Sequence, residues 1–297
     1  MTDDRCGQMF EFIRNKKNEP LRIDPAYAKE LTEQAQSLME RDEPKRALRL
    51  YLKAMEIYDT LFGSDPETYR KQTAACADGL GAAYENLEKY SDAYDRYLFS
   101  AELLKELADP AHPEEMKDLA DAYCNLGDTF FFRNKYDHAE KEYHKALELL
   151  YQLVGIDSAA YLEDLAYCFD CLAKSYSGKE DYTHCLEYYD RVIEIYQKLI
   201  ADHKGSPLDE VYIDLNEELA SVYGDIGYIY SCCKKLEQAE DYYLRAASIF
   251  RNLAAQDPDH YTESLAAQYE DLAALYDDMN NHELAKEYKK KAQNPDI

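Results

Sequence analysis

The chain repeats one pattern of small and large apolar positions about every 46 residues. Six small residues recur at intervals of 46, 46, 46, 54 and 46, with an alanine seven residues before each and a large apolar or aromatic residue three residues after each. Offsets of three, four and seven fall on one face of an α-helix. The pattern predicts a first helix in each of six repeats, in which the small residue lets a neighbouring helix come close. These anchor residues are Ala35, Gly81, Gly127, Ala173, Gly227 and Ala273.

A second apolar stripe follows in every repeat. A small residue lies twelve positions after each anchor, and an aromatic residue lies sixteen positions after the first five anchors. Two striped helices joined by a short polar turn form an αα-hairpin. The sixth repeat has Lys289 at the aromatic position, which indicates a polar outer face at the end of the array. The aromatic residues are Tyr51, Tyr97, Tyr143, Tyr189 and Tyr243.

Helix-start signals precede three of the first helices, at Asp65-Pro66, Asp157-Ser158 and Asp257-Pro258. An aspartate accepts hydrogen bonds from the free amides of the first turn, and proline there gives up a donor that had no partner. In the second repeat these signals predict a first helix over residues 66–86. The predicted fold is all-α, an α-solenoid of six helix pairs. Its domain spans 25–297, with repeats at 25–64, 65–108, 109–156, 157–202, 208–256 and 257–297.

The six repeats resemble tetratricopeptide repeats. The resemblance is carried by residues such as Leu126, Gly127, Phe130, Tyr136, Ala139, Tyr143 and Ala146. The spacing of 46 residues exceeds the family's usual unit and is similar to its long-helix bacterial and kinesin-light-chain-like variants. The resemblance implies a right-handed superhelix whose first helices line a concave groove that holds peptides or helices of partner proteins.

Two segments depart from the pattern. Residues 1–24 lack it, although Met9, Phe10, Phe12 and Ile13 could form a helix that caps the first repeat. Disorder is the alternative for this segment. The longer fourth interval adds residues near His203–Pro207, within 203–209, which either contact a partner or reflect neutral drift.

The formal charge of −26 lies almost wholly beyond residue 60, since residues 1–60 hold nearly equal numbers of basic and acidic side chains. Nucleic acids and anionic membranes are poor partners for such a surface, because binding them depends on clustered Lys and Arg. No apolar run is long enough to span a bilayer, and no secretion signal is visible. The eight cysteines are then expected to be reduced thiols, which predicts a cytoplasmic protein.

The sequence contains few candidates for catalytic or metal-binding residues. Cys168 and Cys171 form a Cys-x-x-Cys, but they fall within a predicted helix rather than after a strand. Cys185 and His184 are the nearest further metal ligands, and Cys185 occupies a position that is alanine in the other five repeats. These cysteines are therefore interpreted as packing residues. We expect no metal, no cofactor and no enzymatic activity.

Acidic residues concentrate two and three positions before the anchors, on the side where tetratricopeptide repeats usually meet ligands. Half of these twelve positions are acidic and none is Lys or Arg. We expect a basic segment of a partner to bind here, with Phe131, Phe132 and Tyr228 as apolar contacts; a merely solvated acidic surface is the alternative. The family's basic set for acidic chaperone tails is missing apart from Asn125. The acidic candidates at these positions are Asp78, Asp170, Asp225, Glu270 and Asp271, and two more, Asp128 and Asp277, lie further along the same side.

Three functions remain compatible with the sequence. The first is a non-enzymatic interaction scaffold that binds a basic peptide or helix in the acidic groove. The second is a regulatory protein that senses a peptide or signal. The third is a structural subunit that assembles through its convex face or ends, although we expect a monomer.

Overall fold

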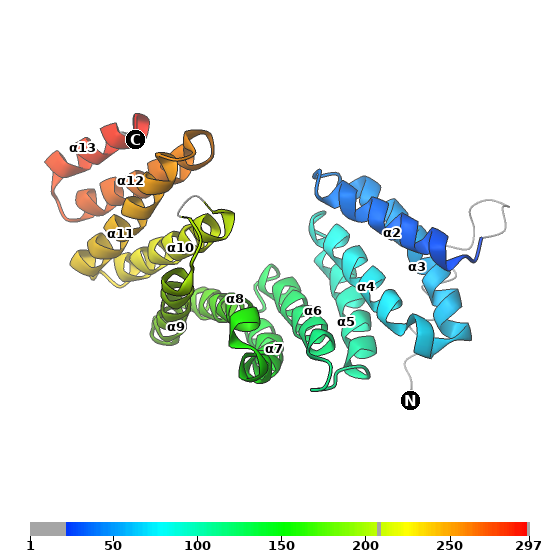
Figure 1. Ribbon diagram of the computed structural model, residues 1–297. Helices are drawn as coiled ribbons and strands as arrows, with labels where there is room; N and C mark the ends of the chain where they lie inside the picture. Colours follow the sequence, from blue (N-terminus) through cyan, green and yellow to red (C-terminus); the bar gives the residue numbers. More distant parts are fainter. Residues whose placement is uncertain (1–21, 207–208, 296–297) are drawn as a thin grey trace. The chain divides into compact units, whose positions relative to one another are not determined.

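The computed structural model describes residues 22–206 and 209–295, in which twelve α-helices and no β-strand occur (Figure 1). The chain divides into two compact units, Met1–Leu103 and Leu104–Ile297, which are described separately. Unit 1 contains α2 (Pro25–Met39), α3 (Pro44–Ser64), α4 (Pro66–Glu85) and most of α5 (Tyr90–Lys105). Unit 2 contains α6 (Pro113–Phe131), α7 (Tyr136–Ile156), α8 (Ser158–Gly178), α9 (Tyr182–Asp202), α10 (Glu210–Cys232), α11 (Leu236–Ala254), α12 (Pro258–Asp278) and α13 (His282–Gln293).

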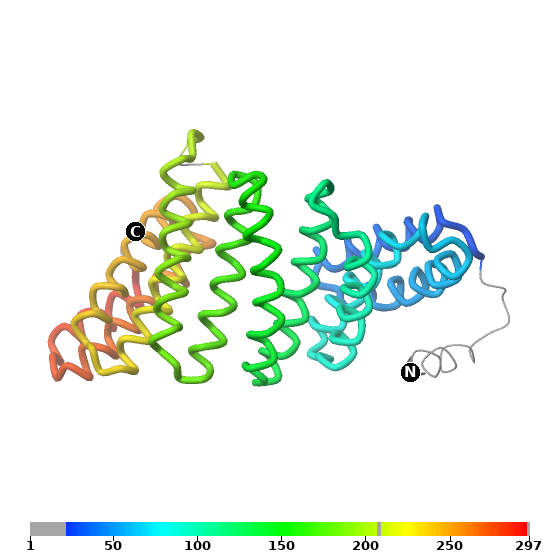
Figure 2. Tube along the Cα trace, turned by 90° about the horizontal axis from the view of Figure 1, so that it is seen from below, coloured from blue at the N-terminus to red at the C-terminus, as the bar shows by residue number. Residues whose placement is uncertain are grey.

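The predicted all-α solenoid of paired helices is confirmed. In unit 2 each helix packs against the next from α6 to α13, and α6 also contacts α8; Figure 2 shows these green-to-red helices side by side. In unit 1, α2 packs on α3 and α3 on α4. The handedness of the superhelix and the domain boundaries stay predictions. The capping segment was predicted within residues 1–24, of which residues 1–21 lie outside the described residues. Residues 207–208 of the insert also lie outside them.

The predicted helix starts are present as side-chain caps. Asp65 accepts a hydrogen bond from the amide of Thr68 (3.2 Å) at the start of α4. Asp157 accepts from two amides at the start of α8, and Asp257 accepts from the amide of His260 (3.2 Å) at the start of α12. These bonds satisfy amides that have no carbonyl partner inside the helix. The second-repeat helix ends at Glu85, one residue before the predicted end.

The glycine anchors lie against the tyrosine of the second helix in their own repeat. A Cβ added at Gly127 would approach the Tyr143 ring to 2.2 Å, and one added at Gly81 would approach the Tyr97 ring to 2.6 Å. Gly227 faces Tyr243 in the same way, at 2.7 Å. These tyrosines are buried. A small residue is therefore required at these anchors because an aromatic ring occupies the space of its side chain.

Every turn between the paired helices contains one non-glycine residue in the left-handed region. It lies seven positions after each anchor, with φ between 55° and 59°.

Replacing Glu180 by glycine is expected to raise the free energy of unfolding by about 0.5–1 kcal/mol, because relief of about 1–2 kcal/mol of left-handed strain exceeds the entropy that glycine adds to the unfolded chain. Urea unfolding followed by circular dichroism measures the difference. Asn134→Gly is the control: asparagine tolerates this conformation, so a gain equal to that of Glu180→Gly would contradict the explanation.

Candidate functional site

A half-buried carboxylate lies where three helices of unit 2 meet. Asp128 on α6 accepts hydrogen bonds from the hydroxyls of Tyr143 on α7 (2.6 Å) and Tyr167 on α8 (3.1 Å). Burial raises the pKa of the Asp128 carboxyl, and the two tyrosine hydroxyls offset only part of this rise. The carboxylate is held in one position while its charge is only partly compensated.

Two further carboxylates surround Lys174 of α8. Its ammonium lies 2.6 Å from the carboxylate of Asp170 on the same helix. Asp225 on α10 accepts a hydrogen bond from the Tyr189 hydroxyl (3.0 Å). Burial raises the pKa of both carboxyls, and the charge of Lys174 opposes that rise in each case. Two carboxylates therefore share one cation, which leaves an excess of negative charge.

Lys117 of α6 lies between two more carboxylates. Its ammonium is 2.7 Å from Asp121, one turn further along α6, and 3.0 Å from Asp164 on α8. Sequence reasoning missed Lys117 and Lys174, because it searched the first helices for acidic and aromatic residues and did not ask which cations lie beside them. The spacing of four residues between each lysine and an aspartate is typical of ion pairs on a helix and could have identified both. The surface is acidic but contains two neutralising amines.

The acidic candidates of α12 differ from one another. Burial raises the pKa of the Asp271 carboxyl to about 6, and the charge of Glu270 adds to the rise. Glu270 and Asp271 are both exposed residues. Asp277 lies at the end of α12 and bonds Lys289 of α13 (2.6 Å) and His282 (3.3 Å), so the structure does not place it with the other carboxylates. The hydrogen bond from Lys289 lowers its pKa.

We call Asp128, Asp170, Lys174, Asp225 and Asp271 the acidic row. Its members come from the first helices α6, α8, α10 and α12. Neighbouring first helices are linked by direct contacts. Tyr167 of α8 donates to Asp128 of α6, and the side-chain amide of Gln268 on α12 lies 3.3 Å from where a Cβ on Gly224 of α10 would be. Asp78 lies in unit 1, where it accepts a hydrogen bond from Ser100 (2.8 Å), and is therefore described apart from the row.

The predicted apolar contacts are partly accessible. Phe132 is 49% exposed and Tyr228 is 60% exposed, which leaves both rings open to a partner. Phe131 is half-buried and meets the rings of Phe132 and Tyr136 edge-on, with centroids 5.7 and 5.6 Å away. Asn125 is half-buried on α6. Phe131 and Phe132 lie at the end of α6, whereas Tyr228 lies inside α10.

The candidate cysteines lie in the core of unit 2. Cys168, Cys171 and Cys185 are buried, and the Cys168 thiol donates to the backbone carbonyl of Tyr143 (3.3 Å). Burial raises the pKa of the Cys171 thiol and raises that of Cys185 to about 12. Residues 22–206 and 209–295 contain no group of three or more His, Cys, Asp or Glu residues placed to hold a metal ion. Among the helices described, none has the length and apolar character required to cross a membrane.

Sequence reasoning also missed a recurring aromatic cluster beside the second helices. In the fourth repeat Tyr176 and Tyr188 stack with centroids 5.5 Å apart, and Arg191 lies over Phe169 at 5.5 Å. The fifth and sixth repeats have the same stack, formed by Tyr230 with Tyr242 and by Tyr276 with Tyr288. Because the stacked residues fall three and fifteen positions after the anchor, and the cation eighteen positions after it, the sequence contained this signal.

Comparison with known proteins identifies the repeats. A family model described as tetratricopeptide repeat matches residues 120–149 and 220–253, which include the anchors Gly127 and Gly227. The predicted tetratricopeptide repeats are therefore confirmed. No curated protein matches the chain.

Three solved structures share the fold. BtubC (BKLC) from P. vanneervenii is 19% identical, with a TM-score of 0.64 over 84% of this chain and 89% of that one. The apo form of RapI is 16% identical, with a TM-score of 0.56 over 96% of this chain and 87% of that one. The apo form of the quorum sensor NprR from B. thuringiensis is 15% identical, with a TM-score of 0.60 over 97% of this chain and 68% of that one. At these identities the likeness establishes the fold alone.

Proposed function

We propose that this chain of tetratricopeptide repeats is a non-enzymatic interaction scaffold, and that the acidic row of unit 2 binds a basic segment of a partner protein. The observation that supports it most directly is that the carboxylates of Asp128 and Asp225 are held in place while their negative charge is only partly compensated. Both carboxylates are fixed by tyrosine hydroxyls, and burial raises the pKa of both. An added cation would stabilise their charged forms, so a lysine or arginine side chain is the complementary ligand.

The exposed rings of Phe132 and Tyr228 supply the apolar part of the proposed contact. Aromatic side chains contribute much of the affinity of protein interfaces, whereas charges set orientation and association rate. The free thiols of all seven described cysteines support a reducing, cytoplasmic setting for the partner.

The test uses a fluorescent peptide of alternating lysine and leucine and its glutamate counterpart. Replacing Asp128, Asp225 and Asp271 by asparagine is expected to weaken binding of the lysine peptide at least about tenfold, because the attraction of the row is lost while side-chain shape is kept. Anisotropy titrations measure the affinities, and binding to the wild type should also weaken as salt is raised.

The matched control replaces three exposed carboxylates outside the row, as Asp202→Asn, Glu237→Gln and Asp259→Asn. This variant has the same net charge as the row variant and should bind the lysine peptide like the wild type. Equal weakening in both variants would show that only the overall charge attracts the peptide. Equal affinity of the wild type for the lysine and glutamate peptides would reject the proposal outright.

A second candidate function is the sensing of a peptide or signal. It is favoured by the likeness to the quorum sensor NprR, which extends over 97% of this chain. In that case a bound peptide should change the radius of gyration measured by small-angle X-ray scattering. A scaffold that binds without rearrangement should leave it unchanged.

A further inference from the structure

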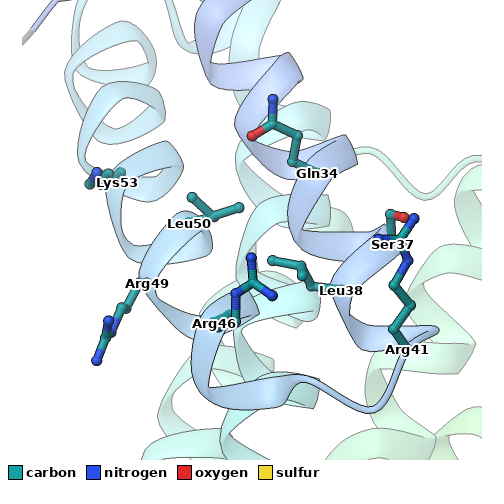
Figure 3. A pocket seen from close by; sticks show the side chains of 8 residues that line it. All are labelled: Gln34, Ser37, Leu38, Arg41, Arg46, Arg49, Leu50 and Lys53. Carbon is teal, nitrogen blue, oxygen red and sulfur yellow. The ribbon is translucent and has the colours of Figure 1, made fainter.

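A basic pocket lies between α2 and α3 of unit 1. It has a volume of about 550 Å³, and Figure 3 shows Leu38 and Leu50 in the space between the two helices. Four cationic side chains border the same space, and all four residues are exposed. They are Arg41, Arg46, Arg49 and Lys53. This concentration of positive charge contrasts with a net charge of −26 for the whole chain.

The pocket occupies the place of the aromatic clusters found in later repeats. Leu38 and Leu50 lie three and fifteen positions after the anchor Ala35, where the fourth repeat has the stacked pair Tyr176 and Tyr188. Lys53 lies eighteen positions after the anchor, where the later repeats have a cation over an aromatic ring. Two leucines fill less space than two stacked tyrosines, which explains why a pocket remains here.

Unit 2 shows what covers this face when another repeat precedes it. The Tyr176 hydroxyl donates to Glu140 on α7 (2.6 Å), and Lys179 donates to the same carboxylate (2.9 Å). Lys179 also pairs with Asp137 of α7 (2.8 Å). In the sixth repeat, Tyr276 donates to Glu240 of α11 in the same way (2.5 Å). The cover of this face is thus a helix that presents carboxylates to hydroxyls and amines.

A second copy of this chain does not provide such a helix at its last repeat. The final second helix, α13, has Lys286 at the position that is Glu140 in the third repeat and Glu240 in the fifth. Its sequence continues with three lysines at residues 289–291. α13 keeps one carboxylate, Glu283, at the position of Asp137. Stacking it on the α2–α3 pocket would nevertheless place Lys286 where Glu140 lies in unit 2, a cation against cations, which disfavours association. Long polyanions are also disfavoured, because residues 61–297 hold almost all of the net negative charge.

We propose that the α2–α3 pocket is the docking site for an acidic amphipathic helix of a partner protein. The apolar side of the helix contacts Leu38 and Leu50, and its carboxylates pair with Arg41, Arg49 and Lys53. Arg46 already pairs with Glu43 of its own helix end. Such a helix continues the stacking that α7 provides for the fourth repeat. This site is separate from the acidic row and takes a ligand of opposite charge.

The probe is a fluorescent synthetic peptide with the sequence of α7, Tyr136–Ile156, because that helix covers the equivalent face in unit 2. The full chain is expected to bind it. The double variant Arg41→Glu, Lys53→Glu, which includes the residue equivalent to Lys179, should bind it at least about tenfold more weakly. A second peptide, with Asp137→Lys and Glu140→Lys, should show the reverse preference and bind the double variant better than the wild type.

The matched control variant is Lys198→Glu, Lys204→Glu, which makes the same charge change at exposed residues of unit 2. It should bind the α7 peptide like the wild type. The proposal is overturned if both double variants lose the same affinity, or if neither loses any, since the peptide would then bind elsewhere. Binding that appears only after removal of residues 1–21 would overturn it in favour of the chain's own N-terminal segment. Self-association abolished by Arg41→Glu, Lys53→Glu would identify a second copy as the occupant instead.

Discussion

Replacing Tyr143 by alanine is expected to lower the free energy of unfolding by about 3–5 kcal/mol, the range found for removing a large aromatic side chain from a core. The side chain is only 1% exposed. Its ring lies directly over Gly127, which has no side chain of its own to fill the space that the ring leaves. Its hydroxyl also donates to Asp128, so the substitution removes one of the donors that hold a half-buried carboxylate.

Tyr143→Phe separates the two contributions. The ring is kept, and only the hydrogen bond to Asp128 is lost, so the expected decrease is about 1–3 kcal/mol. Urea unfolding of the full chain measures both variants. Tyr228→Ala is the control, because its side chain is 60% exposed and its removal should cost less than about 1 kcal/mol. Equal losses for Tyr143→Ala and Tyr228→Ala would show that the ring over Gly127 does not stabilise the repeat.

Replacing Asp59 by asparagine is expected to stabilise the protein at pH 8 by about 1–3 kcal/mol, taking about 1.4 kcal/mol per pKa unit as the upper limit. Asp59 lies on α3, and burial raises its pKa from 3.8 to about 6. The charge of Arg96 opposes this rise without cancelling it. Asparagine has nearly the same shape and carries no charge that must be removed from water.

The pH dependence distinguishes this explanation from a general gain in packing. Because the folded-state pKa is above the unfolded one, the folded state binds more protons between about pH 4 and 6, so Asp59 lowers stability as pH rises through this range. The advantage of Asp59→Asn should be full above about pH 6 and should vanish near pH 4. Unfolding curves from pH 4 to 8 measure it. Glu102→Gln, an exposed carboxylate on α5, should show little change, and a pH-independent advantage of Asp59→Asn would contradict the assignment.

The sequence predicted the repeat register and the helix starts well because both depend on local geometry. A helix of 3.6 residues per turn converts spacing into a face, so the anchors and their tyrosines could be assigned without coordinates. Capping by Asp65 and Asp157 depends only on amides within three residues. The left-handed turn residues were missed, because glycine is the usual signal for them and none of the six is glycine.

Within the candidate site, the sequence identified Asp128, Asp170 and Asp225 as acidic positions near the anchors, but not their surroundings. The bond between Tyr167 and Asp128 joins residues 39 apart in the chain. That between Tyr189 and Asp225 joins residues 36 apart. Such contacts depend on how neighbouring first and second helices are rotated and shifted, which the spacing within one helix does not specify.

The sequence by itself determined that this protein is an array of paired helices with tetratricopeptide repeats, which positions face the core, and that the chain is strongly acidic. Only the tertiary structure decided which carboxylates share a lysine, which are held by tyrosine hydroxyls, and that two leucines and four cations form a pocket between α2 and α3. The physical reason is the distance along the chain over which each kind of interaction acts. Helix periodicity and capping act over a few residues, whereas burial and charge pairing depend on side chains that packing brings together from distant parts of the chain.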